Sequence, residues 1–496
     1  MSMTKKTGKF YAKKLMSGSV ALMISQSSMK LVKLLVLPVM TYYLSPRDFG
    51  IIASIKMVQG FLILLYNPGV ISGLSRLYYD TEDEKERKML FGSTLLFFTL
   101  ISVSVTLLII LLGEEVFRKA FNEFDLYPYG IIAVLIAALV QPKRLWSSLM
   151  TFKYKVTKIA FFSFIQLAID VGISLYLVVI AGWGVNGRVA GMVAGVVFIF
   201  IVSIVTLIKY IQWKFSVLKM VEILKFSLPL APAIWAYSVL DIADRFLIEH
   251  YIGLTDLGIY SVAYILSSVP LFLSLGFRKM WTPIFFENMN EKRYEQIDSM
   301  VKLFLILYSA VCGGLILYSE EVVEIFLAKG FNTSKTIIPW VVLGVFFLGI
   351  LPVSTSFITY EKKFKKVSLN ALFSALVNII LNIILLPRIG VIGSAIATFI
   401  AYLIYFMLNV FTAGRMFFAV INSKNFLIPL LFLTISVSLY FHLKMNILSF
   451  VIKTGLVLLF FYFLIKSNYF NKKEKEFMGA LLSKGYNKIS KWNERN

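Results

Sequence analysis

The chain has 496 residues, of which 58% are hydrophobic and only 16% are charged. A mean hydropathy of +0.80 lies outside the soluble range and predicts a polytopic membrane protein. The net charge of +23 would suggest nucleic acid as partner of a soluble protein. Here the basic residues lie between apolar stretches, so membrane lipids account for them and no nucleic-acid partner is expected. One cysteine and two distant histidines predict no disulfide framework, metal site or cofactor.

The apolar segments predict about 14 transmembrane helices, each long enough to cross a bilayer. Segments with the period-2 pattern of membrane strands are missing from the sequence, so the fold class is an all-α helix bundle. The expected spans are residues 18–44, 49–75, 90–112, 128–150, 159–181, 186–209, 226–252, 256–278, 298–318, 335–359, 367–387, 391–414, 426–443 and 447–465.

Positive charge alternates between the segments that connect these spans. Of the 50 Lys and Arg residues, 37 are counted with connecting segments on one side, Lys143 among them, and 8 with loops on the other, Arg188 among them. Because cytoplasmic segments carry the excess of Lys and Arg, both termini are expected in the cytoplasm. The alternation also favours an even number of spans, with 12 as the alternative if the last two segments are misread.

A nine-residue motif recurs with four identical positions, first as Tyr43–Ile51 and again as Tyr251–Ile259, at an offset of 208 residues. A second pair, Gly184–Gly187 and Gly390–Gly393, follows at an offset of 206. Both pairs join two spans through a short outer turn. The first six spans and the next six are therefore expected to be parallel copies of one unit, related by an axis along the membrane normal.

Within the first motif, Asp48 and Asp256 suit N-cap positions, and Gly50 and Gly258 allow close helix contact. Two such lobes leave a central cleft, which favours transport by alternating access. The expected organisation is a basic cytoplasmic N-terminus (1–17), an N-lobe (18–211), a cytoplasmic linker (212–225), a C-lobe (226–415), two added spans (426–466) and a basic cytoplasmic tail (467–496).

The turn Leu44-Ser-Pro-Arg-Asp-Phe-Gly50, together with the repeat, resembles the polysaccharide-transporter family of the multidrug/oligosaccharidyl-lipid/polysaccharide exporter superfamily. The family's turn typically reads Leu-Gly-Pro-Glu-Asp-Phe-Gly. The resemblance implies a flippase of the bacterial cytoplasmic membrane and no enzyme. Its cargo would be an undecaprenyl-diphosphate-linked oligosaccharide of an O-antigen, capsule or similar glycan. The implied partners are this lipid-linked oligosaccharide, membrane lipids, and a glycan polymerase or export machinery.

Charged residues inside the first two spans are costly in a bilayer and suggest a functional site. Gln26, Lys30 and Lys33 fall on one face of the first span, and Lys56 and Gln59 on one face of the second. Lysine is a good point-charge ligand for phosphate, so this cationic stripe is expected to line the cleft and bind a diphosphate. For Lys56 the alternative is that its ammonium reaches the membrane surface.

The seventh span carries charges of both signs. Asp241, Arg245 and Glu249 lie at i, i+4 and i+8 and are expected to pair along one face. Arg245 is a further candidate for the diphosphate, or else neutralises Asp241 or Asp244. The three acids are candidates for ion coupling. The alternative for Lys30 and Lys33 is an ion pair with Asp241 or Asp244 across the lobes.

Three other charges are less decisive. Asp170 is a candidate for contact with sugar or a coupling proton, and interhelical hydrogen bonds are the alternative. Arg278 is a candidate for the cargo entry or a simple cytoplasmic-side charge. Lys453 is expected to reach the membrane surface or to pack at the periphery. The rival function is a proton- or sodium-coupled drug or cation antiporter of the same superfamily, which the lysines disfavour and the acids of the seventh span leave open.

Overall fold

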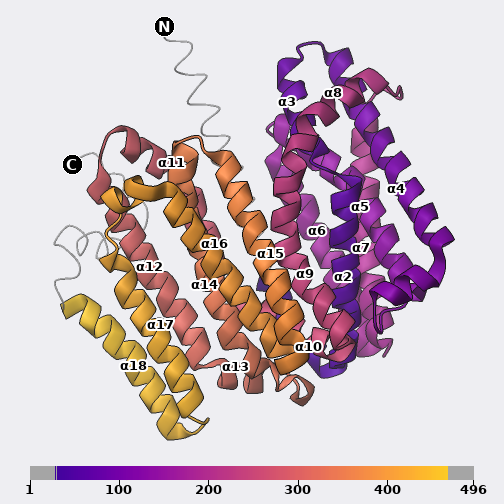
Figure 1. Cartoon of the computed structure of the whole chain (residues 1–496). Helices are drawn as coiled ribbons and strands as arrows, with labels where there is room; N and C mark the ends of the chain where they lie inside the picture. Colours follow the sequence, from indigo (N-terminus) through magenta and orange to yellow (C-terminus); the bar gives the residue numbers. More distant parts are fainter. Residues whose placement is uncertain (1–27, 30, 467–496) are drawn as a thin grey trace.

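The computed structural model describes residues 28–29 and 31–466, and within them every regular element is helical. In Figure 1, α2 to α7 lie on one side and α11 to α18 on the other, with α9 and α10 between them. The first half comprises the Leu31–Tyr43 helix, α2 (Pro46–Tyr66), α3 (Val70–Asp80), α4 (Glu84–Ala120), η1 (Leu126–Gly130), α5 (Ile131–Phe152), α6 (Val156–Leu175), η2 (Tyr176–Ile180), α7 (Gly184–Leu207) and η3 (Ile208–Tyr210).

The rest of the described chain follows the same scheme and ends in two further helices. It comprises α8 (Val217–Ser227), η4 (Leu228–Leu230), α9 (Ala231–Tyr251), α10 (Leu254–Ser267), α11 (Leu271–Asn290), α12 (Tyr294–Leu317), α13 (Ser319–Phe326), η5 (Lys329–Phe331), α14 (Ser334–Tyr360), α15 (Phe364–Ile389), α16 (Val391–Val420), α17 (Lys424–His442) and α18 (Ile447–Lys466).

The helical fold class is confirmed, and ten helices of residues 28–29 and 31–466 are long and apolar enough to cross a membrane. The count rises to eleven if α10 and α11, which are bent by 48° at their junction, form one span. The predicted seventh span contains α9, which carries four charged residues of the sequence and so fails a test of apolar composition. The number fourteen therefore stays a prediction.

The duplicated motif forms a reciprocal contact between α2 and α10. A Cβ atom on Gly50 would lie 1.9 Å from the carbonyl oxygen of Leu254, and one on Gly258 would lie 1.8 Å from that of Pro46. Pro46 and Leu254 occupy equivalent positions in the two copies of the repeat. The two helices thus cross at the pseudo-two-fold axis through backbone contacts that no larger residue permits, as the motif predicted.

The second pair of matching turns is equally symmetric. Gly187, in the first turn of α7, packs against Leu177, and Gly393 of α16 packs against Leu385. The two leucines are 208 residues apart, the offset of the first motif. Both halves therefore use one packing solution to bring consecutive helices together.

The expected N-caps are wrong. Ser45 is the N-cap of α2, and Asp48 lies three residues later, where its carboxylate accepts the Ser45 backbone N–H at 2.8 Å to complete a capping box. In α10 the N-cap is Gly253, and Asp256 lies in the first turn. Ser45 and Gly253 occupy the N-cap positions, so both acids stand at the third helical position.

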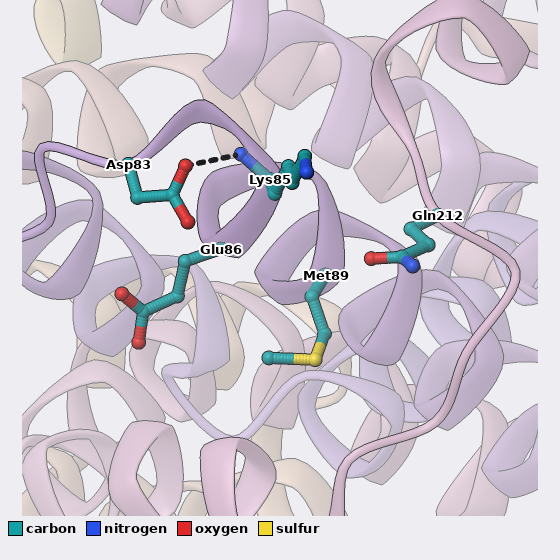
Figure 2. Close-up of a pocket in the computed structure, with 5 residues that line it drawn as sticks. All are labelled: Asp83, Lys85, Glu86, Met89 and Gln212. Atoms are coloured by element: carbon teal, nitrogen blue, oxygen red, sulfur yellow. Dashed lines mark hydrogen bonds between the residues drawn. The ribbon is translucent and has the colours of Figure 1, made fainter.

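The predicted linker 212–225 consists mainly of α8, which rests on the first half of the bundle. A Cβ atom on Gly73 of α3 would lie 2.3 Å from the carbonyl oxygen of Ile223. Lys219 pairs with Glu86 of α4 at 2.5 Å, and this hydrogen bond raises the pKa of the lysine. Figure 2 shows the hollow beside this contact, where Gln212 approaches the start of α4 and the Asp83 carboxylate accepts the Lys85 backbone N–H. Of the charged residues that line this hollow, Glu86 takes part in the ion pair that holds α8 on α4.

Lys453 does not pack at the periphery. Its side chain is fully buried on α18, and its Nζ lies 2.7 Å from Glu321 Oε1 of α13. Next to this pair, the Tyr318 and Thr454 hydroxyls lie 2.7 Å apart. A buried ion pair thus fastens the last helix of the described chain to the body of the protein. The periodicity of the sequence could not reveal it, because Glu321 lies in a predicted outer loop.

Removing one partner of this pair should destabilise the protein. Replacing Lys453 by Met leaves the Glu321 carboxylate buried and unpaired, which costs about 3–5 kcal/mol. We expect a lower Tm of the purified protein, with much of the loss recovered when Glu321→Gln is added. The control is Lys444→Met, which removes an exposed lysine from the segment between α17 and α18. An unchanged Tm in the Lys453 variant would contradict the assignment.

Candidate functional site

The first helices provide part of the expected cationic stripe. Gln26 and Lys30 lie outside the described residues. Lys33 is exposed on the Leu31–Tyr43 helix, and Lys56 is exposed on α2 with the half-buried Gln59 one turn further along. The structure therefore places Lys33, Lys56 and Gln59 of the stripe, whereas the contribution of Gln26 and Lys30 stays a prediction.

Lys56 lies on α2 among charges from several other helices. The charges of Lys33, Arg188, Asp170 and Arg245 are all close enough to act on its ammonium, and they come from four other helices. Yet Lys56 is exposed and makes no hydrogen bond or ion pair with any described residue. We call the region that this exposed cation and the surrounding charges line the chamber. The alternative in which the Lys56 ammonium reaches the membrane surface stays a prediction.

The charges around Lys56 lie about 9–15 Å along their helices from the helix ends at one face of the bundle. At about 1.5 Å per residue, Lys56 lies about 15 Å from the start of α2. Asp170 lies about 15 Å from the end of η2, and Arg245 about 9 Å from the end of α9. All three helix ends belong to the same face of the bundle, so these side chains meet well inside it.

Arg188 belongs to the chamber, although its sequence position suggested an outer loop. It lies in α7, where its guanidinium pairs with the Asp170 carboxylate of α6 and donates a 2.7 Å hydrogen bond to the Ser174 hydroxyl. Asp170 therefore makes the interhelical contact given above as the alternative to sugar or proton contact. The sequence contained a signal for this contact, because Asp170 and Ser174 are spaced i, i+4 on one helix face and can both accept hydrogen bonds from a cationic side chain of a neighbouring helix.

Lys143 is a second missed residue, because it was counted with a cytoplasmic segment. It lies within α5, nine residues before the end of the helix. Its Nζ donates a 2.7 Å hydrogen bond to Gln166 Oε1 of α6, and the charge of Lys33 is close enough to act on it. The chamber thus has cations on the Leu31–Tyr43 helix, α2, α5, α7 and α9.

The acids of α9 divide into separate roles. Arg245 pairs with Asp244 at 3.4 Å, and its guanidinium lies 4.7 Å from the centre of the Tyr264 ring. The alternative in which Arg245 neutralises Asp244 is therefore present in the structure. Asp241 belongs to α9, but its side chain is outside the part that the structure describes.

Asp244 also begins a buried polar chain into the second half of the bundle. Its carboxylate accepts a 2.6 Å hydrogen bond from the Tyr260 hydroxyl, which lies 3.5 Å from the hydroxyl of Thr398. Asn378 donates to Thr398 at 3.5 Å, and Asn382 donates to the Asn378 carbonyl oxygen at 2.9 Å. The chain joins α9, α10, α16 and α15.

Glu249 does not pair with Arg245 along α9 as expected. Its buried carboxylate accepts three backbone N–H groups from the loop after α4, those of Asn122 at 3.0 Å, Glu123 at 2.7 Å and Phe124 at 2.9 Å. The loop follows α4 of the first half and Glu249 belongs to the second, so this contact bridges the halves. Together with the α2–α10 crossing, it forms what we call the closed end.

Two further contacts support the closed end. The His250 ring nitrogen Nδ1 lies 3.1 Å from the Ala120 carbonyl oxygen, and the Phe121 and Phe246 rings meet edge to face at 5.7 Å. In Figure 1 the two groups of helices meet near α2 and α10 and stand apart at the opposite end, near α3 and α15.

Arg278 is exposed on α11. None of the ion pairs among the described residues includes it. Its role at the cargo entry therefore stays a prediction. Within residues 28–29 and 31–466, moreover, no group of three or more His, Cys, Asp and Glu side chains could hold a metal ion.

Comparison with known proteins identifies the chain. A family model described as polysaccharide biosynthesis protein matches residues 39–336. This protein belongs to that family. The succinoglycan biosynthesis transport protein ExoT of Rhizobium meliloti (strain 1021) is 23% identical over 341 residues, which are 66% of this chain and 65% of ExoT. The match thus spans slightly less than two thirds of ExoT.

Solved structures share the fold of this family member. The lipid II flippase MurJ in an inward closed conformation aligns with a TM-score of 0.73 at 18% identity, over 90% of this chain and 99% of MurJ. An inward-facing multidrug resistance MATE transporter of the MOP superfamily aligns at 0.63 and 12% identity, over 79% and 95%. The chain is therefore a multi-pass membrane protein with the fold of these transporters.

The Glu249 contact should hold the closed end shut. Glutamine in its place offers one accepting oxygen and turns an N–H group toward the loop donors, so about 1.5–3 kcal/mol of charge-assisted hydrogen bonding is lost. We expect Glu249→Gln to broaden and lengthen the distance between spin labels at Lys119 and Asn332, measured by electron–electron double resonance. Glu114→Gln, on the exposed end of α4, is the control. Identical distance distributions in all three proteins would show that Glu249 does not hold the halves together.

Proposed function

We propose that this protein is a flippase that moves an undecaprenyl-diphosphate-linked oligosaccharide from the cytoplasmic to the outer leaflet of a bacterial cytoplasmic membrane. The glycan would be an O-antigen, capsule or similar repeat unit. Transport occurs by alternating access, with both termini in the cytoplasm and the closed end facing outward. The cargo head enters the chamber from the opposite end, between the two halves.

The observation that carries this proposal is the excess of positive charge in the chamber. The described residues bring five cations together, Lys33, Lys56, Lys143, Arg188 and Arg245, against the carboxylates of Asp170 and Asp244. Even with Asp241 of α9 counted, the chamber is positive. Unbalanced charge away from bulk water is expensive, so the chamber favours an anion. A diphosphate supplies two or more negative charges in a compact group.

The relatives support the same class of cargo. The matched family is one of polysaccharide biosynthesis, the similar protein from Rhizobium meliloti is a succinoglycan biosynthesis transport protein, and the MurJ fold is that of a lipid II flippase. These are transport proteins rather than enzymes. A lipid-linked saccharide is the cargo that fits both their names and a cationic chamber.

A cation antiporter is the second candidate, and the buried Asp244 is the observation that favours it. In that case the carboxylate would exchange a proton or sodium ion for a cationic cargo. The neighbouring Arg245 and the chamber lysines oppose this use, because a cationic cargo would be repelled by them. As part of a flippase, Asp244, Asp241 and Asp170 remain candidates for ion coupling, and Glu249 is assigned to the closed end.

Flipping can be measured directly in proteoliposomes. The probe is an undecaprenyl-diphosphate-linked oligosaccharide with a fluorescent label on the sugar, which membrane-impermeant dithionite bleaches only in the outer leaflet. The native protein should expose the inner-leaflet half to dithionite. Lys56→Met should slow this by about 10- to 100-fold, the effect of one charge-assisted hydrogen bond.

The control for this assay is Lys365→Met, which removes an exposed lysine at the start of α15 and should flip at the native rate. An inner-leaflet half that stays protected with the native protein would contradict the proposal. Uptake of a cationic dye in the same vesicles, driven by a proton or sodium gradient, would favour the antiporter.

A further inference from the structure

We propose that Lys143 is a second phosphate-binding residue of the chamber, and that the cargo diphosphate docks on the first half of the bundle between Lys143 and Lys56. This inference rests on the proposed function and assigns its anion-binding site. It also explains why a diphosphate, rather than a monophosphate, fits the chamber. Three observations carry it, namely the surroundings of Lys143, the polar face of α6 and the neutral counterpart of that face in the second half.

Lys143 and Lys56 are chamber lysines that make no ion pair with an acid among the described residues. The hydrogen bond of Lys143 goes to the neutral Gln166 amide, which fixes the ammonium without neutralising it. Lys33 is close enough to act on both Lys56 and Lys143. Since α2 also packs against α5, Lys33, Lys56 and Lys143 form one cluster across the Leu31–Tyr43 helix, α2 and α5, which we call the row, with Lys56 and Lys143 as its two ends.

One face of α6 holds this side of the chamber in place. Gln166, Asp170 and Ser174 follow each other at i, i+4 and i+8, so they share a face. Gln166 orients Lys143 of α5, whereas Asp170 and Ser174 orient Arg188 of α7. A single helix thus positions one cation from each neighbour, and the Lys143 ammonium keeps two N–H donors for a ligand.

Small residues on α7 make this arrangement possible. A Cβ atom on Gly191 would lie 2.1 Å from the Ser174 hydroxyl, and one on Gly195 would lie 3.0 Å from the Asp170 Cβ. Larger residues would push α7 away from the polar face of α6. The close packing therefore belongs to the positioning of the cations.

The equivalent face in the second half carries no cation. At the offset of 208 residues, Gln166, Asp170 and Ser174 correspond to Ser374, Asn378 and Asn382 of α15, all buried. The position equivalent to Lys143 is Leu351. The neutral face bonds to Thr398 instead. The repeat is thus symmetric in packing and one-sided in charge, so the anionic head is expected to stay with the first half while the halves rock.

The chemistry predicts a test based on phosphate number. A diphosphate spans two phosphates and can contact lysines at both ends of the row, whereas a monophosphate occupies one end. The native protein should bind undecaprenyl diphosphate at least about 10-fold more tightly than undecaprenyl monophosphate. Lys143→Met should remove most of this preference by weakening the diphosphate about 10- to 100-fold, with the monophosphate changed less than about threefold.

Affinities are measured by native mass spectrometry of the purified full-length protein with each lipid. Lys143→Arg keeps the charge and should keep most of the preference, and Lys158→Met removes an exposed lysine at the start of α6 as the matched control. If Lys143→Met does not fold, Gln166→Leu, which removes only the fixing hydrogen bond, should reduce the preference in the same direction.

The outcomes separate this inference from the proposed function. If the native protein binds undecaprenyl diphosphate and the Lys143 and Gln166 variants keep the native preference, Lys143 is not a phosphate ligand and the flippase proposal stands. Equal weakening of both lipids would also overturn the two-ended site. If the native protein binds neither lipid, the proposed function itself fails.

Discussion

Positive charge held inside an apolar bundle is the constraint around which this protein is built. An isolated cation at the centre of a bilayer costs at least about 2.5–3.5 kcal/mol, and several cations here lie along the spans rather than at their ends. The protein offsets part of this cost locally, since Asp170 neutralises Arg188 and Asp244 neutralises Arg245. Lys56 is left exposed to the chamber. A site that keeps a cation solvated and surrounded by others is suited to an anion that arrives and leaves.

Two different kinds of contact close the bundle beyond this site. The α2–α10 crossing is symmetric, because Gly50 and Gly258 each rest on a carbonyl oxygen of the other copy. The Glu249 contact is one-sided, and the position equivalent to it in the first half is Thr41. The glycine contacts depend on shape alone, whereas opening this end would break the three hydrogen bonds that the Glu249 carboxylate accepts. The two contacts together therefore suit an end that is either closed or open, without partly open states.

Much of the fold could be predicted from the sequence, because apolar length and a repeated turn are local signals. The helical class, the parallel duplication and the Gly50–Gly258 contact follow from them. The site was harder, since partners in space are distant in the chain. Lys143 and Arg188 were assigned to connecting segments because they stand near the ends of apolar runs. Glu249 was expected to pair with Arg245 along its helix, but its carboxylate accepts hydrogen bonds from three backbone N–H groups of a loop. Lys453 pairs with Glu321, which lies 132 residues away in the chain.

The most direct test of the account is the charge preference of the chamber itself. A thiol introduced as Gln59→Cys, in a Cys312→Ser background, leaves every chamber lysine in place. Its reaction with small anionic and cationic methanethiosulfonate reagents of similar size can be timed in inside-out membrane vesicles, with free thiol rates as reference. The account predicts that the anionic reagent reacts faster relative to its free rate, and that Lys56→Met and Lys143→Met each reduce this preference. Faster reaction of the cationic reagent would contradict the central claim that the chamber is an anion site.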